Sequence, residues 1–103
     1  MLDRPWVPHT YLERQRRWVA IRQMLVREQD GLCAICGQPM RQGDRNIDHV
    51  WPRGAGGYHG LGNLVAAHFD CNNRKGHQLP TGCEIIQLVA VCARLDVPVR
   101  LKA

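Results

Sequence analysis

The sequence contains no long apolar run and no recognisable leader segment. No stretch reaches the ~18 consecutive apolar residues that a membrane-spanning helix needs. Met1 is followed by "LDRPWVPHTY", which has neither the basic region nor the apolar core of a secretory signal peptide. These absences predict a soluble, cytoplasmic protein with no membrane partner.

Disulfide bonds are not expected to stabilise this short chain, because its five cysteines cannot all pair and a reducing compartment disfavours pairing. A domain of 103 residues buries only about 60 to 65% of the surface that its unfolded chain exposes. We therefore expect one domain over residues 1–103, stabilised by a bound metal ion. Cys83 and Cys92 fall in an apolar helical segment, where a buried free thiol without a further role is expected.

Acidic residues are outnumbered, with nine Asp and Glu against fourteen Lys and Arg and a net charge of +5. This excess fits a polyanionic partner without requiring one. The arginines of the first predicted helix form either a solvated polar face, which we favour for any single arginine, or a surface that contacts phosphate. They are Arg14, Arg16, Arg17, Arg22 and Arg27.

The N-terminal third is predicted to be an arm followed by a helix. Residues 1–9 contain two prolines and are expected to form an extended arm. Thr10 and Glu13 have the spacing of a capping box, which predicts the start of a helix. Apolar residues then recur at helical spacing until Gly31 ends the element.

The remaining segments complete an α+β pattern. Two runs rich in β-formers are separated by a loop with five glycines in ten residues, and helix signals follow. We expect short strands within 46–50 and 63–68, a short helix entered through Asp70, and a helix from a Thr81–Glu84 capping box to Pro98.

Two ligand pairs predict a zinc site. They are Cys33 with Cys36 in a C-x2-C turn, and His68 with Cys71 in an H-x2-C turn, with 31 residues between the pairs. Two such turns supply the closed tetrahedral Cys3His set typical of structural Zn²⁺. Zinc bound in this way contributes on the order of 10 kcal/mol of apparent free energy in small domains. A thioredoxin-like redox pair is the rival interpretation of Cys33 and Cys36, but its strand-helix-strand context is missing.

An acid and a histidine, Asp48 and His49, stand side by side in the first predicted strand. Such a pair suits a site in which the carboxylate holds a hard divalent cation and the imidazole approaches a water molecule. Asn63 and Asn72 carry amides that can order a loop or give a carbonyl oxygen to Mg²⁺. Simpler explanations exist: an isolated Asp-His pair is usually a strand-end acid beside a surface histidine, Asn63 suits a turn, and Asn72 suits a helix cap.

Together these segments resemble a known family. "IDHVWPRGAGG" and "NLVAAHFDCNNRKG", flanked by the two ligand pairs, are similar to the HNH endonucleases with a ββα-metal (His-Me) finger, especially the small zinc-stapled members of bacteria and phages. The resemblance covers residues 33–76. It implies a ββα-metal core with two zinc knuckles, an N-terminal helix and a C-terminal helix. It also implies an enzyme that hydrolyses DNA phosphodiester bonds with a divalent cation.

The resemblance implies a role for each residue of the Asp-His site. His49 would be the general base that activates the attacking water. Asp48 and Asn72 would hold the catalytic cation, Mg²⁺ or Mn²⁺. Asn63 would bridge the loop between the strands and keep His49 correctly presented.

The DNA-binding residues implied by the resemblance are Lys75, which would contact phosphate, and Arg74, a weaker candidate. The chain departs from the commonest family pattern at Asn72, where histidine is usual, and at His68, which replaces a third zinc cysteine. These departures leave the preferred metal and the zinc geometry open. His59 and His77 stand outside the predicted core set, and Trp51 and Tyr58 are expected to pack rather than to stack on bases.

The expected partner is DNA, bound mainly through phosphate and with little sequence specificity, because no recognition helix is evident. Phage members of the family work beside DNA-packaging proteins, which the resemblance offers as further partners. The main alternative is a zinc-stapled nucleic-acid-binding module without hydrolysis. A purely structural zinc domain would explain the cysteines but not the Asp48-His49 site.

Overall fold

The helices and strands follow the predicted order. The computed structural model describes residues 11–103, so the expected arm over 1–9 and the cap at Thr10 lie outside the described part. Three helices and a two-stranded sheet confirm the α+β class, and no helix within 11–103 combines the length and apolar character that crossing a bilayer requires. The elements are α1 (Tyr11–Glu28), β1 (Asn46–His49), the 3₁₀ turn η1 (Arg53–Ala55), β2 (Leu64–Ala67), α2 (Phe69–Lys75) and α3 (Gly82–Leu95).

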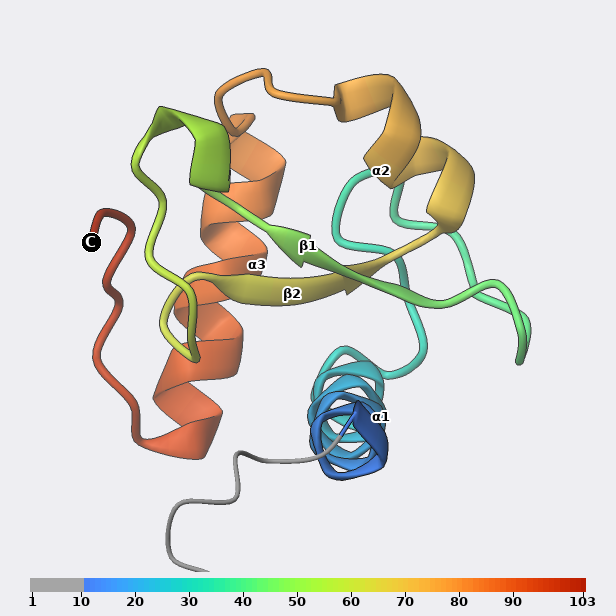
Figure 1. Ribbon diagram of the computed structural model, residues 1–103. Coiled ribbons are helices and arrows are strands. Elements are labelled where there is room, and N and C mark those ends of the chain that lie inside the picture. Colours follow the sequence, from blue (N-terminus) through green and yellow to red (C-terminus); the bar gives the residue numbers. More distant parts are fainter. Residues whose placement is uncertain (1–10) are drawn as a thin grey trace, which may run out of the picture.

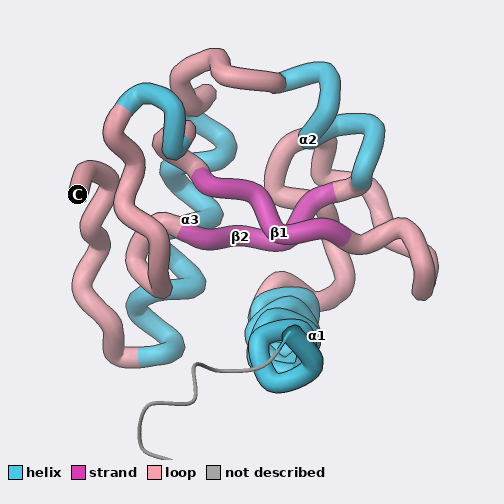
Figure 2. Tube along the Cα trace, viewed as in Figure 1, coloured by secondary structure: helices cyan, strands magenta, loops and turns pink. Residues whose placement is uncertain are grey.

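The hairpin of β1 and β2 forms the centre of the fold. The strands pair antiparallel, with Asp48 opposite Val65 and His49 opposite Leu64. In Figure 1, α1 lies below the hairpin and α2 lies above it, and long loops lead into and out of β1 (Figure 2). Successive strand side chains point to opposite faces. Ile47 therefore packs into the core beside α1, whereas Asp48 is buried on the α2 side.

The core has two parts because β2 is covered on both faces. Leu64 and Ala66 pack in one cluster with Leu25 of α1. Val65 faces the other way and packs in a second cluster with Leu88 of α3. This is why every residue of β2 is buried. In β1, by contrast, only Asp48 is buried and the other three residues are partly exposed.

A buried glutamine completes the free edge of β2. Gln29 is 1% exposed; its side chain accepts a hydrogen bond from Ala66 N at 2.7 Å and donates to Ala66 O at 2.9 Å. Its Nε2 also donates to Leu32 O at 2.9 Å. These bonds replace a third strand, since an unpaired buried backbone edge would be costly. Nothing in the local sequence around Gln29 predicted this contact.

The boundaries of α1 and α2 differ slightly from the predicted ones. α1 ends at Glu28 rather than at Gly31, whose φ of 75° already belongs to the turn. α2 begins at Phe69 with His68 as its N-cap, rather than through Asp70. The N-cap position matters because it points the His68 backbone and ring toward the first cysteine pair.

α3 begins at the predicted capping box. Thr81 Oγ1 accepts from Glu84 N, and Glu84 Oε1 accepts from Thr81 N, each at 3.3 Å. The helix ends at Leu95 rather than running to Pro98, because Asp96 takes a left-handed conformation with φ of 56°.

The C-terminal tail returns to the glycine-rich loop. Tyr58 N donates to Leu101 O at 2.8 Å, and Arg100 N donates to Gly62 O at 2.9 Å. The backbones approach so closely that a Cβ on Gly62 would lie 2.7 Å from Pro98 O, and the φ of Gly62 is 108°. Glycine is needed there on both counts. The tail therefore braces the loop that connects the two strands.

Candidate functional site

The four predicted zinc ligands come together. Their ligand atoms, from Cys33, Cys36, His68 and Cys71, all lie within 4.8 Å of one another. Cys36 Sγ lies 3.4 Å from His68 Nδ1, and Cys71 Sγ lies 3.7 Å from it. With Zn–S of about 2.3 Å and Zn–N of about 2.0 to 2.1 Å, a tetrahedral ion places such atoms about 3.6 Å apart. The donor set and its spacing therefore fit zinc.

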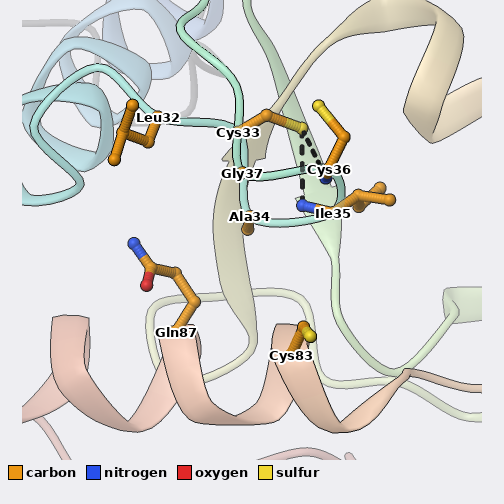
Figure 3. Close-up of a pocket in the computed structure, with 8 residues that line it drawn as sticks. All are labelled: Leu32, Cys33, Ala34, Ile35, Cys36, Gly37, Cys83 and Gln87. Carbon is orange, nitrogen blue, oxygen red and sulfur yellow. Dashed lines mark hydrogen bonds between the residues drawn. The ribbon is translucent and has the colours of Figure 1, made fainter.

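The turn that carries Cys33 and Cys36 is shaped by backbone amides directed at sulfur. The amides of Ile35 and Cys36 lie 3.4 and 3.5 Å from Cys33 Sγ (dashed in Figure 3). His68 N donates to the same sulfur at 3.4 Å. Gly37, with φ of 78°, closes the turn. Amide donors stabilise the thiolate, which is the form that binds metal.

The second nitrogen of the His68 ring fixes which nitrogen faces the cysteines. Nε2 lies 3.0 Å from Pro39 O. Because a carbonyl oxygen can only accept, Nε2 carries the proton and Nδ1 is left for a metal. Burial, followed by the hydrogen bond with Cys36 and the charge of Cys33, raises the pKa of Cys71 to about 11. Cys71 is therefore a neutral thiol at pH 7 unless a bound cation favours its thiolate.

The other two cysteines of the C-terminal helix stand apart from this cluster. Cys92 is buried in the core with Leu88, which confirms the expected burial. Cys83 is exposed, so the expected burial is wrong at that position. It lies on α3 across a cavity of about 220 Å³ from the Cys33–Gly37 turn (Figure 3).

A second candidate site lies at the end of β1. Asp48, His49 and Asn72 line one cavity of about 170 Å³, together with His77. Asn72 reaches it from α2, and its Nδ2 donates to Ile47 O at 3.3 Å. That bond uses the amide nitrogen, whereas a hard cation binds the amide oxygen. The three residues predicted from the Asp-His pair are thus gathered by the hairpin and the helix that follows it.

Lys75 does not occupy the exposed position that a phosphate contact requires. It is 8% exposed, and its Nζ donates to the Asp48 oxygens at 3.2 and 3.0 Å and to Glu84 Oε2 at 2.7 Å. The backbone oxygens of His49 and Val50 also accept from it, each at 2.9 Å. The expected phosphate role of Lys75 is therefore corrected: the ammonium group joins α2 to β1 and α3.

Two carboxylates share this single ammonium group. Asp48 is 3% and Glu84 is 1% exposed. Burial, and next the hydrogen bond with Glu84, raises the pKa of Asp48 to about 7, against the attraction of Lys75. When both acids are ionised, the group carries one net negative charge, which a cation at Asp48 would balance. Sequence reasoning found Glu84 only as a helix cap and missed this second role.

His49 lies against His59, a histidine that we did not include in the predicted core set. His49 Nε2 is 2.9 Å from His59 Nδ1, and the two rings stack with centroids 5.1 Å apart. Burial, followed by the nearby charges of His59, Arg53 and Lys75, lowers the pKa of His49 to about 4. The imidazole is therefore neutral at pH 7 and able to accept a proton. No short-range pattern linked the two histidines, which are ten residues apart.

Asn63 is fully buried and holds the loop after β1. Its Oδ1 accepts from Trp51 N at 2.8 Å, and its Nδ2 donates to Trp51 O at 3.0 Å and to Tyr58 O at 2.8 Å. Val50 N donates to Asn63 O at 2.9 Å. These contacts span the loop that follows His49. Asn63 therefore bridges the loop after β1 from a fully buried position.

An exposed arginine and two half-buried aromatic residues complete the surroundings of the site. Arg74, on the outer side of α2, donates to Cys71 Sγ at 3.6 Å and remains exposed. Trp51 and Tyr58 pack under cations of the C-terminal tail: Lys102 Nζ lies 4.6 Å from the Trp51 ring centroid, and Arg100 Cζ lies 4.2 Å from that of Tyr58. This agrees with a packing role for both aromatic residues.

Comparison with known proteins identifies the family. The model of a family described as HNH endonuclease matches residues 33–84, which is 52 of 103 residues and includes both candidate sites. The chain belongs to the HNH endonuclease family. This HNH chain is also 39% identical over 57 residues to the CRISPR-associated endonuclease Cas9 of Corynebacterium diphtheriae. The matched stretch is 54% of this chain and 5% of Cas9, so the chain spans a small part of that relative's length.

Within the HNH match, β1, β2 and α2 form the ββα unit, and both sites depend on it. His68, which follows β2, and Cys71, on α2, reach the cysteine turn, while β1 and α2 bring Asp48 and Asn72 to the second cavity. The ββα fold and the family that the resemblance implied are both confirmed.

Proposed function

We propose that this HNH chain is a metal-dependent endonuclease that hydrolyses DNA phosphodiester bonds. The observation that carries the proposal is the shared cavity of Asp48, His49 and Asn72, inside the stretch matched by the family. A general base beside two hard oxygen donors is what hydrolysis of a phosphodiester requires.

His49 is the proposed general base. Its lowered pKa keeps the ring neutral at physiological pH, so it can accept a proton from water. Asn63 supports this role by holding the segment that follows His49. General-base assistance typically contributes about 10²- to 10⁴-fold to a rate.

Asp48 and Asn72 are the proposed ligands of a divalent cation, Mg²⁺ or Mn²⁺. A carboxylate and an amide oxygen are suitable donors, and Mg²⁺ often binds through one or two protein groups and keeps several waters. Each carboxylate oxygen of Asp48 has lone pairs beyond the one used by Lys75. When bound, the cation would neutralise charge on the phosphate and polarise it toward attack.

The Cys3His cluster is proposed to hold structural Zn²⁺. All four coordination positions are supplied by protein, which leaves no open position for a substrate. The zinc would tie the loop after α1 to the start of α2, and so support the helix that carries Asn72.

DNA is the proposed substrate, held mainly by its phosphates. The chain carries a net charge of +5, and the exposed Arg74 lies on the same helix as Asn72. Binding through phosphate should weaken steeply with salt and should show little sequence preference.

The test is cleavage of supercoiled plasmid. Protein treated with mild EDTA, with its zinc content checked, receives Mg²⁺, Mn²⁺ or neither. We expect nicking or linearisation only with added metal, and its loss in His49→Ala and Asp48→Asn proteins that keep their zinc. The control is Asp70→Asn, which removes one exposed carboxylate from α2. This variant should cleave plasmid like the wild type.

One observation favours a second function, a DNA-binding module without hydrolysis. Both oxygens of Asp48 already bond to Lys75, so the carboxylate has a structural partner without any cation. Intact plasmid together with a salt-sensitive gel shift, for every metal tried, would support this module and reject the nuclease.

A further inference from the structure

The α1 helix carries a feature that the HNH match does not include, since the match begins at residue 33. Arg14, Trp18 and Arg22 recur every four residues and therefore lie along one face of the helix. Trp18 is half-buried and packs against the core, so this face is turned toward the hairpin. Two arginines are thus held on either side of a tryptophan next to the strands.

Two cavities flank Trp18 on this face. One, of about 260 Å³, is lined by Arg14, Trp18 and His59 among others. The other, of about 290 Å³, is lined by Trp18, Arg22 and His49 among others. We call these two cavities, with Trp18 between them, the α1 groove. Its second cavity opens on the proposed general base.

A row of rings connects the α1 groove to the proposed catalytic cavity. The centroids of Trp18 and His59 are 5.0 Å apart, and those of His59 and His49 are 5.1 Å apart. His49 also lines the cavity that contains Asp48 and Asn72. A ligand whose reacting atom sits beside His49 therefore has a direct path along this row to α1.

The charge of the α1 groove selects an anionic ligand. Among the described residues that line its two cavities, none is acidic, while arginines are present in both. Arg14 is exposed and Arg22 is half-exposed. From Arg14 to Arg22 the helix rises about 12 Å, a length that corresponds to about three to four steps of one DNA strand at 3.4 Å per nucleotide.

We propose that the α1 groove binds the DNA strand beside the scissile phosphate, with Arg14 and Arg22 on phosphates and Trp18 against a sugar or base. The inference rests on the proposed function and assigns it a substrate-binding surface outside the ββα unit. Trp18 suits this position because an aromatic face contacts any nucleotide without reading its sequence. In this proposal Arg14 and Arg22 contact phosphate, whereas Arg16 and Arg27 lie on the opposite, solvated face of the helix.

The test compares two double variants that remove equal charge from the same helix. Arg14→Gln/Arg22→Gln changes the groove face. Arg16→Gln/Arg27→Gln is the control, because these exposed residues lie about 160° and 180° around the helix from Trp18. Each pair is placed in a His49→Ala background, and duplex DNA affinity is measured between 50 and 200 mM salt.

Loss of two phosphate contacts should reduce the slope of log affinity against log salt by about 1.8. Between 50 and 200 mM salt, the affinity of the groove variant should therefore fall about ten-fold less than that of the wild type. The control pair should keep the wild-type slope, and Arg14→Lys/Arg22→Lys should restore most of it because the positive charges remain. With His49 intact, the groove pair should raise KM for plasmid cleavage more than it lowers kcat.

Equal slopes for the groove pair and the control pair would overturn the proposal, whatever the activity. Tighter binding of single-stranded RNA than of DNA through the same arginines would overturn DNA as the ligand. A wild type that binds DNA through these arginines but never cleaves it would leave the groove supported and reject the nuclease. A wild type that binds no DNA would reject both.

Discussion

The buried ammonium of Lys75 gives the sharpest quantitative prediction, for the substitution Lys75→Met. Methionine is apolar and fills much of the lysine volume, but it removes the partner of two carboxylates that are 3% and 1% exposed. Removing one partner of a buried ion pair costs about 3 to 5 kcal/mol, because the remaining charge is buried and unpaired. Small domains are stable by on the order of 5 to 15 kcal/mol, so the loss would be a large share of the total.

The pH dependence of this loss follows from Asp48. Asp48 already has a raised pKa, and removing Lys75 should raise it further. An acid whose folded-state pKa exceeds its unfolded value stabilises the fold below the unfolded pKa, and that contribution is lost as pH rises through the folded pKa. Lys75→Met should therefore be less destabilising at pH 5 than at pH 8.

The assay is urea unfolding of the zinc-loaded protein at fixed zinc concentration, since free zinc shifts the apparent stability. Lys102→Met is the control, because Lys102 is the chain's other lysine and is exposed. We expect it to change the free energy of unfolding by less than about 1 kcal/mol. A similarly small loss for Lys75→Met, or a loss that does not depend on pH, would refute the account of the buried group.

Three further predictions concern the two sites. Cys33→Ser should lower the zinc content and the thermal stability together. Cys83→Ser is the control, because Cys83 is exposed and outside the cluster, and this variant should keep its zinc. A Cys33→Ser protein that retains full zinc would contradict the Cys3His site. At saturating Mg²⁺, the plasmid cleavage rate should persist down to about pH 5, because His49 has a pKa of about 4 and stays neutral above it. At lower Mg²⁺, the rate should fall below about pH 7, because protons then compete with Mg²⁺ for the Asp48 carboxylate. A fall in rate centred near pH 6.5 at saturating metal would argue against the lowered pKa. Asn63→Ala should cost about 2 to 4 kcal/mol in urea unfolding, since it leaves buried backbone groups unpaired, whereas the exposed Asn73→Ala should have little effect.

The features that were predictable from the sequence are those set by near neighbours. The two-residue spacings of Cys33 with Cys36 and of His68 with Cys71 each define one turn, and a tetrahedral ion needs two such turns. The Thr81–Glu84 capping box likewise depends on one helical turn and appears as predicted. The Asp-His pair and the strand pattern around it placed β1 within one residue of its observed end.

Contacts between distant segments were not predictable in the same way. Lys75 has the flanking residues of an exposed helix end, but α3 packs beside it and supplies Glu84, so the ammonium is drawn inward. Gln29 reaches Ala66 only because α1 lies against β2. His59 meets His49 because the glycine-rich loop folds back over the end of β1, and the loop is held there by Asn63 and the C-terminal tail.

The α1 arginines show where the boundary between these two kinds of information lies. Helical spacing alone puts Arg14 and Arg22 on one face and Arg16 on the opposite one. Which face borders the site depends on how Trp18 and its apolar neighbours pack against the hairpin. Short-range geometry thus specified the ligand turns, the helix cap and the two faces of α1. The charge partners of Asp48 and the surroundings of His49 were specified by packing, because burial and electrostatic environment depend on residues that the chain brings together only on folding.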